Sequence, residues 1–376
     1  MSTTKKITVT VLAAALGVST LAACGGESKD DSAGEGAGSG SKTVTLVSHD
    51  SFNASPAVLK EFTKQTGYTV KVLKSGDAVE ALNKEILTKG SPQGDVFFGV
   101  DNTTLSRALD NGLFTPYEAK GLERIPEAVQ LDGGEHRVTP VDTGDICVNY
   151  DKKYFADKKL APPRTLDDLI KPAYKDLLVV ENAERSSPGL GFLLGTASAY
   201  GDGGTSQGAA SGGGWQDYWK KLRANGVKVV DSWELAYNQE FSGSAGGKAA
   251  KGDRPLVVSY ASSPPVEVLY AEPQPKEAPT GVSTGTCFRQ TEAAGLLKGA
   301  KNEAGGKALL DFLISKKFQE DMPLNMFVNP VVKDAKLPAL FTEFGEVVAE
   351  PRTMTPEKIA DNRDQWIQSW SSLVLK

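Results

Sequence analysis

The sequence has 376 residues, 40% of them hydrophobic and 8% aromatic, and its 42 basic and 47 acidic side chains give a formal net charge of −5. A chain of this length rarely folds around a single core, so two lobes are expected. The mild excess of acid argues against nucleic acid or anionic lipid as a partner, and it is compatible with a cationic ligand.

The N-terminus has the pattern of a lipoprotein signal peptide. Lys5 and Lys6 form a charged start, residues 7–23 are apolar or small, and the motif LAAC ends at Cys24. This pattern predicts that the signal peptide, 1–23, is removed and that Cys24 carries a lipid, which anchors the chain to the outer face of the cell membrane. The apolar run is too short for a retained membrane helix. Segment 24–42 has no large apolar side chain after its cysteine, which predicts a flexible tether.

Strands and helices are predicted to alternate from residue 43 onward. Strands are expected at 43–48, 68–73 and 95–100, each followed by a helix, at about 56–66, 77–90 and 102–112. The first helix has the clearest ends, since Ser55 is a good N-cap, Pro56 suits the first helical position and Gly67 stops the helix. This order is typical of an α/β fold with a largely parallel sheet.

A second α/β unit follows the first. Strands are predicted at 146–150, 177–181, 227–230 and 255–260, and helices from about residue 188, at 215–226 and from Ser263. Residues 356–374 form an amphipathic pattern that predicts a long C-terminal helix. The glycine-rich stretch 201–214 lacks the lysine of a phosphate-binding loop, so it is interpreted as a surface insertion.

Polar and aromatic side chains gather where the predicted strands end. Each group also suits ordinary structure, such as turns, helix caps or core aromatics. Ligand sites in α/β sheets lie beyond the carboxyl ends of the strands. Carboxylates in the first unit, with hydroxyls and rings in the second, suit a small cationic aromatic ligand between lobes, because each ring face adds about 0.5–2 kcal/mol of cation–π attraction. The groups are His49-Asp50-Ser51-Phe52, Ser75-Gly76-Asp77, Asp101-Asn102, Asp142, Ser186-Ser187-Pro188-Gly189, Asp231-Ser232-Trp233 and Tyr260-Ala261-Ser262-Ser263-Pro264.

Cysteine and histidine usage narrows the class of protein. Apart from Cys24 the chain has Cys147 and Cys287, for which a disulfide is the first interpretation in an exported protein and two reduced, buried cysteines are the alternative. Its two histidines, His49 and His136, have no metal-binding spacing, and no Gly-x-Ser-x-Gly motif occurs. The sequence therefore predicts a protein that is not an enzyme and has no metal site or cofactor.

Eight motifs occur in a fixed order along residues 43–376: SHDSF (48–52), GDAVEALN (76–83), GVDNTTL (99–105), PVDTGDICVNYDK (140–152), SSPGLGFLL (186–194), SWELAY (232–237), VVSYASSP (257–264) and FVNPV (327–331). In this set the sequence resembles the thiamine-binding proteins of bacterial ABC importers, a branch of the type II periplasmic binding protein superfamily. The resemblance implies two lobes, each a mainly parallel sheet flanked by helices, with a ligand cleft between them. Lobe 1 is expected at 43–145 plus 286–345, lobe 2 at 146–285, and a helical segment packing on a lobe at 346–376.

The resemblance also implies a ligand and its contacts. Thiamine, or its mono- or diphosphate, is expected in the cleft of a monomer that delivers it to an ABC permease. Positions for the ligand rings fall on Asp50, Asp77, Ala78, Trp233, Tyr260, Ala261, Ser262 and Ser263, and those for the hydroxyethyl or phosphate end on Ser186 and Ser187. Phe327 stands where some relatives have tryptophan, and Asp142 completes the candidate set. His49 replaces a tyrosine of some relatives, and Pro265 and Val266 stand where others have a stacking tyrosine.

The resemblance also bears on the two cysteines. The motifs DICVNY and GTCFRQ are placed on neighbouring strands that cross between the lobes, which would bring Cys147 and Cys287 within bonding distance.

A different small cation remains an alternative ligand, either a polyamine or a pyrimidine precursor of thiamine. A ferric ion is disfavoured, because ferric binders of the superfamily use paired tyrosines and Tyr260 is followed here by Ala261.

Overall fold

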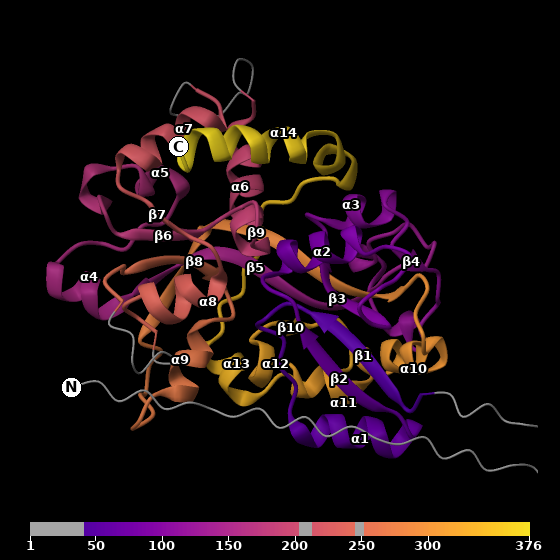
Figure 1. The fold of residues 1–376 in the computed structure, drawn as a ribbon. Coiled ribbons are helices and arrows are strands. Elements are labelled where there is room, and N and C mark those ends of the chain that lie inside the picture. The colour runs from indigo at the N-terminus through magenta and orange to yellow at the C-terminus, as the bar shows by residue number, and fades with distance from the viewer. Residues whose placement is uncertain (1–40, 203–212, 245–251) are drawn as a thin grey trace, which may run out of the picture. The chain divides into compact units, whose positions relative to one another are not determined.

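The computed structural model describes residues 41–202, 213–244 and 252–376, and in these ranges ten strands form one mixed sheet. Its order is β2-β1-β3-β9-β5-β8-β6-β7, with β4 paired to β9 and β10 to β5 (Figure 1). The strands are β1 (Thr43–Ser48), β2 (Thr69–Lys74), β3 (Val96–Asp101), β4 (Phe114–Thr115), β5 (Thr139–Asp151), β6 (Leu178–Glu181), β7 (Lys228–Val230), β8 (Leu256–Tyr260), β9 (Thr280–Leu297) and β10 (Asn329–Pro330). The predicted signal peptide, Cys24 and most of the tether lie outside the described residues, as does much of the glycine-rich stretch 201–214.

The two ends of the sheet are parallel and its centre is antiparallel. Strand β1 pairs in parallel with β2 and β3, and β6 pairs in parallel with β7 and β8. Between these ends, β9 runs antiparallel to β3 and β5, and β5 antiparallel to β8. The parallel ends agree with the predicted β-then-α order. Strand β5 is longer than the strand predicted at 146–150, and β9 was expected only from the motif GTCFRQ that the resemblance places on a strand. Small and polar residues interrupt the apolar pattern of both strands.

Helices cover both faces of the sheet. They are α1 (Pro56–Thr66), α2 (Ala78–Leu87), α3 (Leu105–Asp110), α4 (Lys152–Lys158), α5 (Leu166–Leu169), α6 (Ser187–Tyr200), α7 (Trp215–Ala224), α8 (Trp233–Leu235), α9 (Pro264–Tyr270), α10 (Glu303–Leu313), α11 (Lys316–Asp321), α12 (Pro323–Met326), α13 (Ala339–Phe344) and α14 (Pro356–Val374). Short turns are η1 (Leu122–Arg124), η2 (Glu127–Val129), η3 (Pro172–Tyr174) and the π-turn η4 (Ala236–Glu240).

The ends of α1 are those that the sequence predicts. The Ser55 hydroxyl accepts a hydrogen bond from the Val58 amide at 3.2 Å, and Gly67 ends the helix with a φ of 75°. The helix predicted at 102–112 is shorter, because α3 begins only at Leu105. Its first predicted residues form a turn whose amides and hydroxyls donate to the Asp101 carboxylate instead.

Each parallel end of the sheet has its own hydrophobic core. One core joins β1 and β3 to α1 and α10 through residues such as Leu46, Phe62 and Leu310. The other joins β6 and β8 to α6 and α7, with Phe192 and Trp219 fully buried. Residues 40–376 form one compact unit, and the lobe boundaries given above remain predictions.

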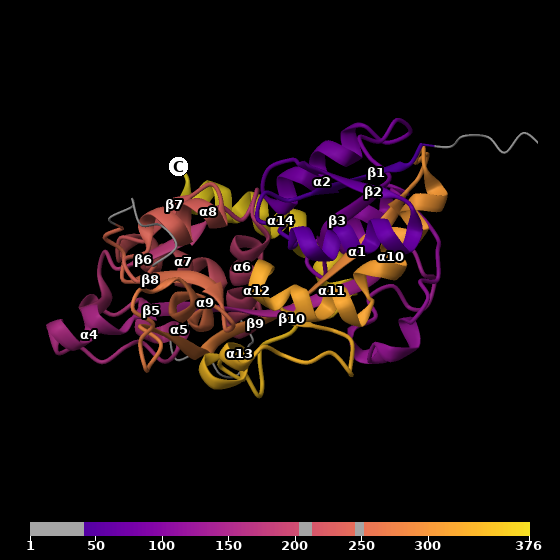
Figure 2. The ribbon, with the colours of Figure 1, turned by 90° about the horizontal axis from the view of Figure 1, so that it is seen from below.

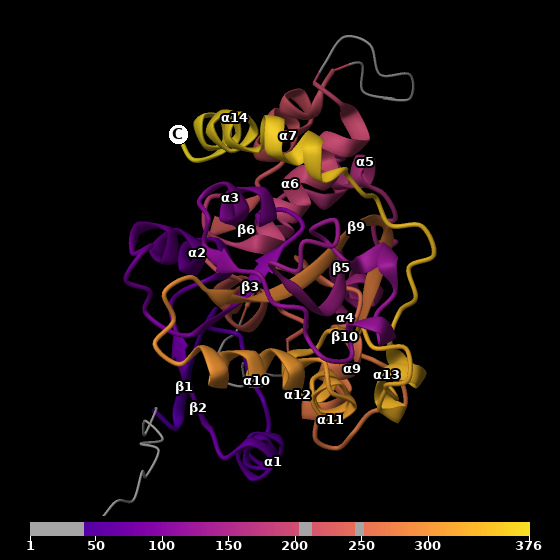
Figure 3. The same cartoon turned by 90° about the vertical axis from the view of Figure 1, so that its right-hand side faces the viewer.

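The C-terminal helix contacts both halves of the fold. Helix α14 packs on α7 and on α3, and it lies along the same side of the molecule as both (Figure 3). Trp366 and Trp370 are buried, and the Trp366 Nε1 atom donates to Asp202 Oδ1 at 2.8 Å. The amphipathic pattern therefore predicts the helix correctly. In the described part of the chain, no helix has the length and apolar character needed to span a bilayer.

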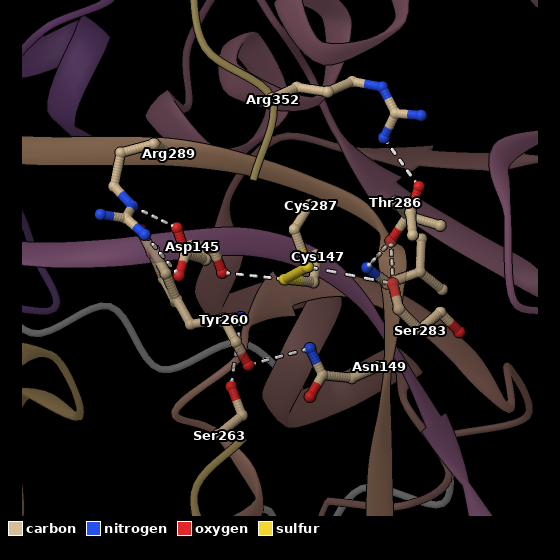
Figure 4. Close-up of a disulfide and its surroundings, with 12 residues drawn as sticks. Asp145, Cys147, Asn149, Tyr260, Ser263, Ser283, Thr286, Cys287, Arg289 and Arg352 are labelled. Atoms are coloured by element: carbon tan, nitrogen blue, oxygen red, sulfur yellow. Dashed lines mark hydrogen bonds and ion pairs between the residues drawn. A yellow bond between two sulfur atoms is a disulfide. The ribbon is translucent and has the colours of Figure 1, made fainter. Parts of the chain in front are cut away.

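A disulfide joins the two central strands. Cys147 on β5 and Cys287 on β9 are bonded at 2.01 Å with Cα atoms 4.2 Å apart (Figure 4), as the resemblance implies. Beside it, the Val148 amide donates to the Thr286 hydroxyl at 2.8 Å, and Arg289 pairs with Asp145. Strands β5 and β9 run through the middle of the fold (Figure 2), so the bond links the strands that connect its two ends.

Candidate functional site

A cavity lies where the ends of several strands and helices meet, and we call it the inner cavity. Its empty space, about 570 Å³, includes space that is open to the solvent. Its lining combines carboxyl groups, hydroxyls and aromatic rings, and among the described residues no lysine or arginine belongs to it. The lining residues are His49, Ser51, Asp77, Ala78, Ser187, Pro188, Trp233, Tyr237, Tyr260, Ser263, Val266, Glu292, Met326, Phe327 and Val328.

The lining residues come from segments far apart in the sequence. His49 and Ser51 follow β1, and Asp77 and Ala78 begin α2 after β2. Ser187 is the first residue of α6, which follows β6. Parallel strands bring their carboxyl ends to the same edge of a sheet, so short connections at that edge converge. This convergence explains why residues predicted separately at strand ends lie around one space.

Trp233 provides a fixed ring surface in the inner cavity. Its indole stacks on Tyr237, with ring centroids 5.0 Å apart and planes 11° apart, and its Nε1 atom donates to the Ser259 hydroxyl at 3.0 Å. Tyr237 is itself held by a 2.6 Å hydrogen bond from its hydroxyl to Glu267 Oε1. The stacked pair can therefore present a ring to a ligand with little loss of side-chain entropy on binding.

Phe327 provides a second ring. Its backbone has a φ of 63°, which is uncommon for a residue with a large side chain. The surrounding contacts hold this conformation, because the Phe327 amide donates to the Pro323 carbonyl and its carbonyl accepts from the Ser262 hydroxyl at 2.6 Å. A strained backbone at a cavity wall is typical of functional positions.

Asp77 joins the two halves of the fold at the cavity. Its Oδ1 atom caps α2 by accepting from the Ala78 amide at 2.6 Å, and its Oδ2 atom accepts from the Trp233 amide at 3.0 Å. Burial raises the pKa of Asp77, while these backbone donors lower it. Nearby, Arg185 pairs with both Glu80 and Asp231 at 2.8 Å. The residues after β2 and those after β6 and β7 are thus held together.

A wider cavity, the outer cavity, adjoins the inner one and shares Trp233, Tyr237 and Phe327 with it. It holds about 1420 Å³ of empty space. Asp50 lines this outer cavity and not the inner one, and its Oδ1 atom accepts from the Gly76 amide at 3.1 Å. Lys74 also lines it, with its Nζ atom donating to the Asp50 carbonyl.

The remaining predicted residues lie behind the lining. Ser186 is buried at the start of α6, and Ala261 is buried beside the disulfide. Ser262 is also buried, with its hydroxyl on the Phe327 carbonyl, and Asp142 on β5 is buried behind Glu292. The structure thus brings Asp77, Ala78, Ser187, Trp233, Tyr260, Ser263 and Phe327 together in the inner cavity, and it places Asp50, Asp142, Ser186, Ala261 and Ser262 outside that lining.

Sequence reasoning did not select Glu292, which lies within β9 and lines the inner cavity. The one available signal is a lone acidic residue in an otherwise small and apolar stretch, TEAAGLL. His49 was noted but not selected, and its Nε2 atom lies 3.6 Å from Glu292 Oε1. Burial lowers the pKa of His49 to about 4, with the Lys74 charge acting in the same direction, so the imidazole is neutral at pH 7.

Comparison with known proteins shows which family the chain resembles as a whole. Residues 57–348 match the model of a family described as bacterial extracellular solute-binding protein. The thiamine-binding periplasmic protein of Salmonella typhimurium is 31% identical over 340 residues, which cover 88% of this chain and 93% of that protein. The protein of the same name from Escherichia coli is 29% identical, with the same two coverages.

Solved structures show the same fold. A periplasmic thiamin binding protein superimposes with a TM-score of 0.74 at 26% identity, covering 88% of this chain and 96% of the other. A ferric binding protein from Campylobacter jejuni superimposes with a TM-score of 0.65 at 18% identity, covering 88% of this chain and 99% of the other, a likeness of fold alone. The chain therefore has the periplasmic binding protein fold, α/β with a mixed sheet, and the predicted fold class is confirmed.

Proposed function

Because the chain belongs to the bacterial extracellular solute-binding proteins, we propose that it captures thiamine or a thiamine phosphate outside the cytoplasm and delivers it to the permease of an ABC importer. Membership in a solute-binding family agrees with the prediction that the chain is not an enzyme. Thiamine combines a permanently cationic thiazolium ring with a flat aminopyrimidine ring. A site for it needs ring faces, a counter-charge and a few hydrogen-bonding groups.

One observation carries the choice of ligand. The inner cavity combines Trp233 and Phe327 with the carboxyl groups of Asp77 and Glu292, in a chain whose relative at 31% identity is named for thiamine binding. Ring faces attract a cation through their quadrupole, and carboxylates offset its charge. Ser187 and Ser263 supply hydroxyls in the same lining for the polar groups of the ligand.

We further propose how the chain is anchored to the membrane and how its two lobes respond to the ligand. Cys24 carries the lipid anchor, and segment 24–42 is the tether that lets the binding domain reorient near the permease. Residues 43–145 plus 286–345 form lobe 1 and residues 146–285 form lobe 2. Ligand binding favours the arrangement in which both lobes contact it, and the permease recognises that arrangement.

Titration with thiamine is the direct test. Isothermal calorimetry on the purified chain is expected to give one site, with a dissociation constant in the micromolar range or tighter. Parallel titrations with thiamine monophosphate and diphosphate identify the preferred form, and spermidine and the free aminopyrimidine serve as competitors. A chain that binds spermidine or the aminopyrimidine but shows no heat with any form of thiamine would refute the proposal.

Asp50 offers a test of which cavity receives the ligand. Because Asp50 lines the outer cavity alone, Asp50→Asn is expected to weaken thiamine binding by about threefold, through the longer-range loss of one negative charge. A loss as large as that caused by changing Asp77 would place the cationic ring in the outer cavity instead.

A further inference from the structure

Three buried carboxyl groups form a row across neighbouring strands at the wall of the inner cavity. Glu292 on β9 is paired in register with Asp101 on β3 and with Asp142 on β5. Their exposed fractions are 0% for Asp101, 1% for Asp142 and 4% for Glu292. Side chains at directly paired positions lie about 4.5–5.5 Å apart at Cβ, and like charges there repel each other. Of the three residues, only Glu292 lines the inner cavity.

Asp101 is the member of the row that is best held in its ionised form. Its Oδ1 atom accepts from the Thr103 amide at 3.0 Å, from the Thr103 hydroxyl at 2.7 Å and from the Thr104 hydroxyl at 2.9 Å. Its Oδ2 atom accepts from Gln290 Nε2 at 2.7 Å. Burial raises the pKa of Asp101, and these donors act against that effect. A proton in the row therefore belongs mainly to the other two carboxyl groups.

Asp142 and Glu292 lack comparable support. Neither oxygen of Asp142 accepts a well-aligned hydrogen bond. Burial raises the pKa of Asp142 to about 7, and burial together with the charges of Asp142 and Asp101 raises the pKa of Glu292 well above its ordinary value. Two adjacent buried carboxyl groups cannot both ionise cheaply, so the pair shares a proton near neutral pH.

The other groups facing Glu292 do not neutralise it. His49, after β1, is uncharged at pH 7, and Asp77 at the start of α2 is acidic. Tyr260, at the end of β8, has a phenol whose pKa is raised well above its ordinary value by burial and by the surrounding carboxyl groups. Lys74 lines the outer cavity and not the inner one. Among the described residues that line the inner cavity, none offers Glu292 a cationic partner.

We propose that Glu292 is the counter-ion of the bound cation, and that the arriving cation displaces the proton shared by Glu292 and Asp142. The inference rests on the proposed function, since it takes the thiazolium of thiamine as that cation. The thiazolium charge does not titrate, so cation and proton compete for the same carboxyl pair. Binding therefore releases a proton. The affinity for thiamine rises with pH until the carboxyl pair has lost the shared proton in the ligand-free protein as well.

Calorimetry on the unmodified chain tests the exchange directly. Thiamine is titrated at pH 7.0 in Pipes and in Tris, two buffers with different ionisation enthalpies, and then at several pH values between 6 and 8. The expected result is a buffer-dependent enthalpy corresponding to release of up to about one proton, and an affinity that falls by about three- to tenfold from pH 7.5 to pH 6.5. Equal enthalpies and a constant affinity, with thiamine still bound, overturn this inference alone. No thiamine binding at any pH overturns the proposed function along with it.

Two variants test whether Glu292 and Asp142 are the residues that exchange the proton for the cation. Glu292→Gln keeps the side-chain shape but has no proton to release, so it is expected to weaken binding at least about tenfold at pH 7.5 and to abolish the pH dependence. Asp142→Asn leaves Asp101 as the one acidic neighbour of Glu292 in the row, so less negative charge opposes the ionisation of Glu292. It is expected to tighten binding several-fold at pH 6.5 and to reduce proton release.

A matched control and a folding check complete the design. Glu343→Gln, on the exposed side of α13, should reproduce the wild-type affinity and pH dependence. Melting curves by circular dichroism establish that each variant is folded, and if Glu292→Gln is not, Asp142→Asn and the buffer comparison still decide. Wild-type affinity with an unchanged pH dependence in folded Glu292→Gln would overturn the inference, as would full proton release in Asp142→Asn.

Discussion

Trp233 is the residue whose replacement should affect thiamine binding most clearly. Its backbone amide donates to Asp77 and its indole Nε1 atom donates to the Ser259 hydroxyl, both at 3.0 Å. Tyr237 stacks against the indole. Trp233→Ala removes the ring and the Nε1 hydrogen bond but keeps the backbone contact with Asp77. The substitution therefore tests the ring itself and leaves the junction between the two halves in place.

The magnitude follows from what the ring can contribute. A cation over an indole gains about 0.5–2 kcal/mol, and stacking of a flat heterocycle on an aromatic side chain contributes about 1–3 kcal/mol. Because one ring cannot make both contacts fully and Tyr237 partly replaces the lost surface, a loss of about 1.5–3 kcal/mol is expected. At about 1.4 kcal/mol per factor of ten, the dissociation constant should rise about ten- to hundredfold.

Intrinsic fluorescence and calorimetry measure the effect independently. Of the five tryptophans, Trp233 alone lines the inner cavity, and the other four are buried in the core formed with α6, α7 and α14. Thiamine should therefore quench the fluorescence of the wild-type protein. Trp233→Phe should lose this quenching and bind thiamine about three- to tenfold more weakly. The control Trp219→Phe should keep the quenching. Binding of Trp233→Ala within twofold of wild type, or undiminished quenching in Trp233→Phe, would refute the proposed position of the ligand.

Three other predictions concern charge, the disulfide and pH. Asp77→Asn should keep the helix cap through its one side-chain oxygen but lose the acceptor for the Trp233 amide. It should weaken thiamine binding about tenfold by calorimetry, because a carboxylate about 5 Å from a cation contributes at most about 3 kcal/mol at an effective dielectric constant near 20. Unchanged affinity would contradict the place of Asp77 in the site. Changing both Cys147 and Cys287 to serine should lower the free energy of unfolding in urea by about 2–5 kcal/mol, and an unchanged midpoint would show that the bond does not stabilise the fold. The pKa of Asp142, about 7 in the folded chain, is higher than its value in the unfolded chain, so the folded state binds the extra proton. The free energy of unfolding of the ligand-free chain should therefore fall as the pH rises from 5 towards 7, by up to about 1.4 kcal/mol per pH unit. Asp142→Asn should reduce that fall in melting experiments, and an identical pH profile would count against the raised pKa.

Local sequence patterns predict the local features of this fold well. Ser55, Pro56 and Gly67 mark the ends of α1 because capping depends on residues within one turn of each other. Asp77 was expected either to cap a helix or to contact a ligand, and the structure shows the cap together with a second contact to Trp233. That second contact joins segments about 150 residues apart, and no local pattern encodes it.

The central strands show where local patterns are insufficient. Strand β9 contains glycine, serine, threonine and glutamine, so its sequence lacks the apolar run of the strands at the sheet ends. It is nevertheless the strand that pairs with β3, β4 and β5, because its neighbours on both sides supply hydrogen bonds and burial. Tertiary context overrides β propensity at such positions.

Features that depend on spacing along a single segment were determined by the sequence alone. They are the alternation of strands and helices, the polar groups at the strand ends and the buried face of the C-terminal helix. The tertiary structure decided which of those strand ends share the inner cavity, and it placed Asp50 on the outer cavity instead. It also decided that Glu292 is set between Asp101 and Asp142, far from either in sequence. Cross-strand register alone creates that neighbourhood, and the ionisation of a buried carboxyl group depends on the charges around it in space.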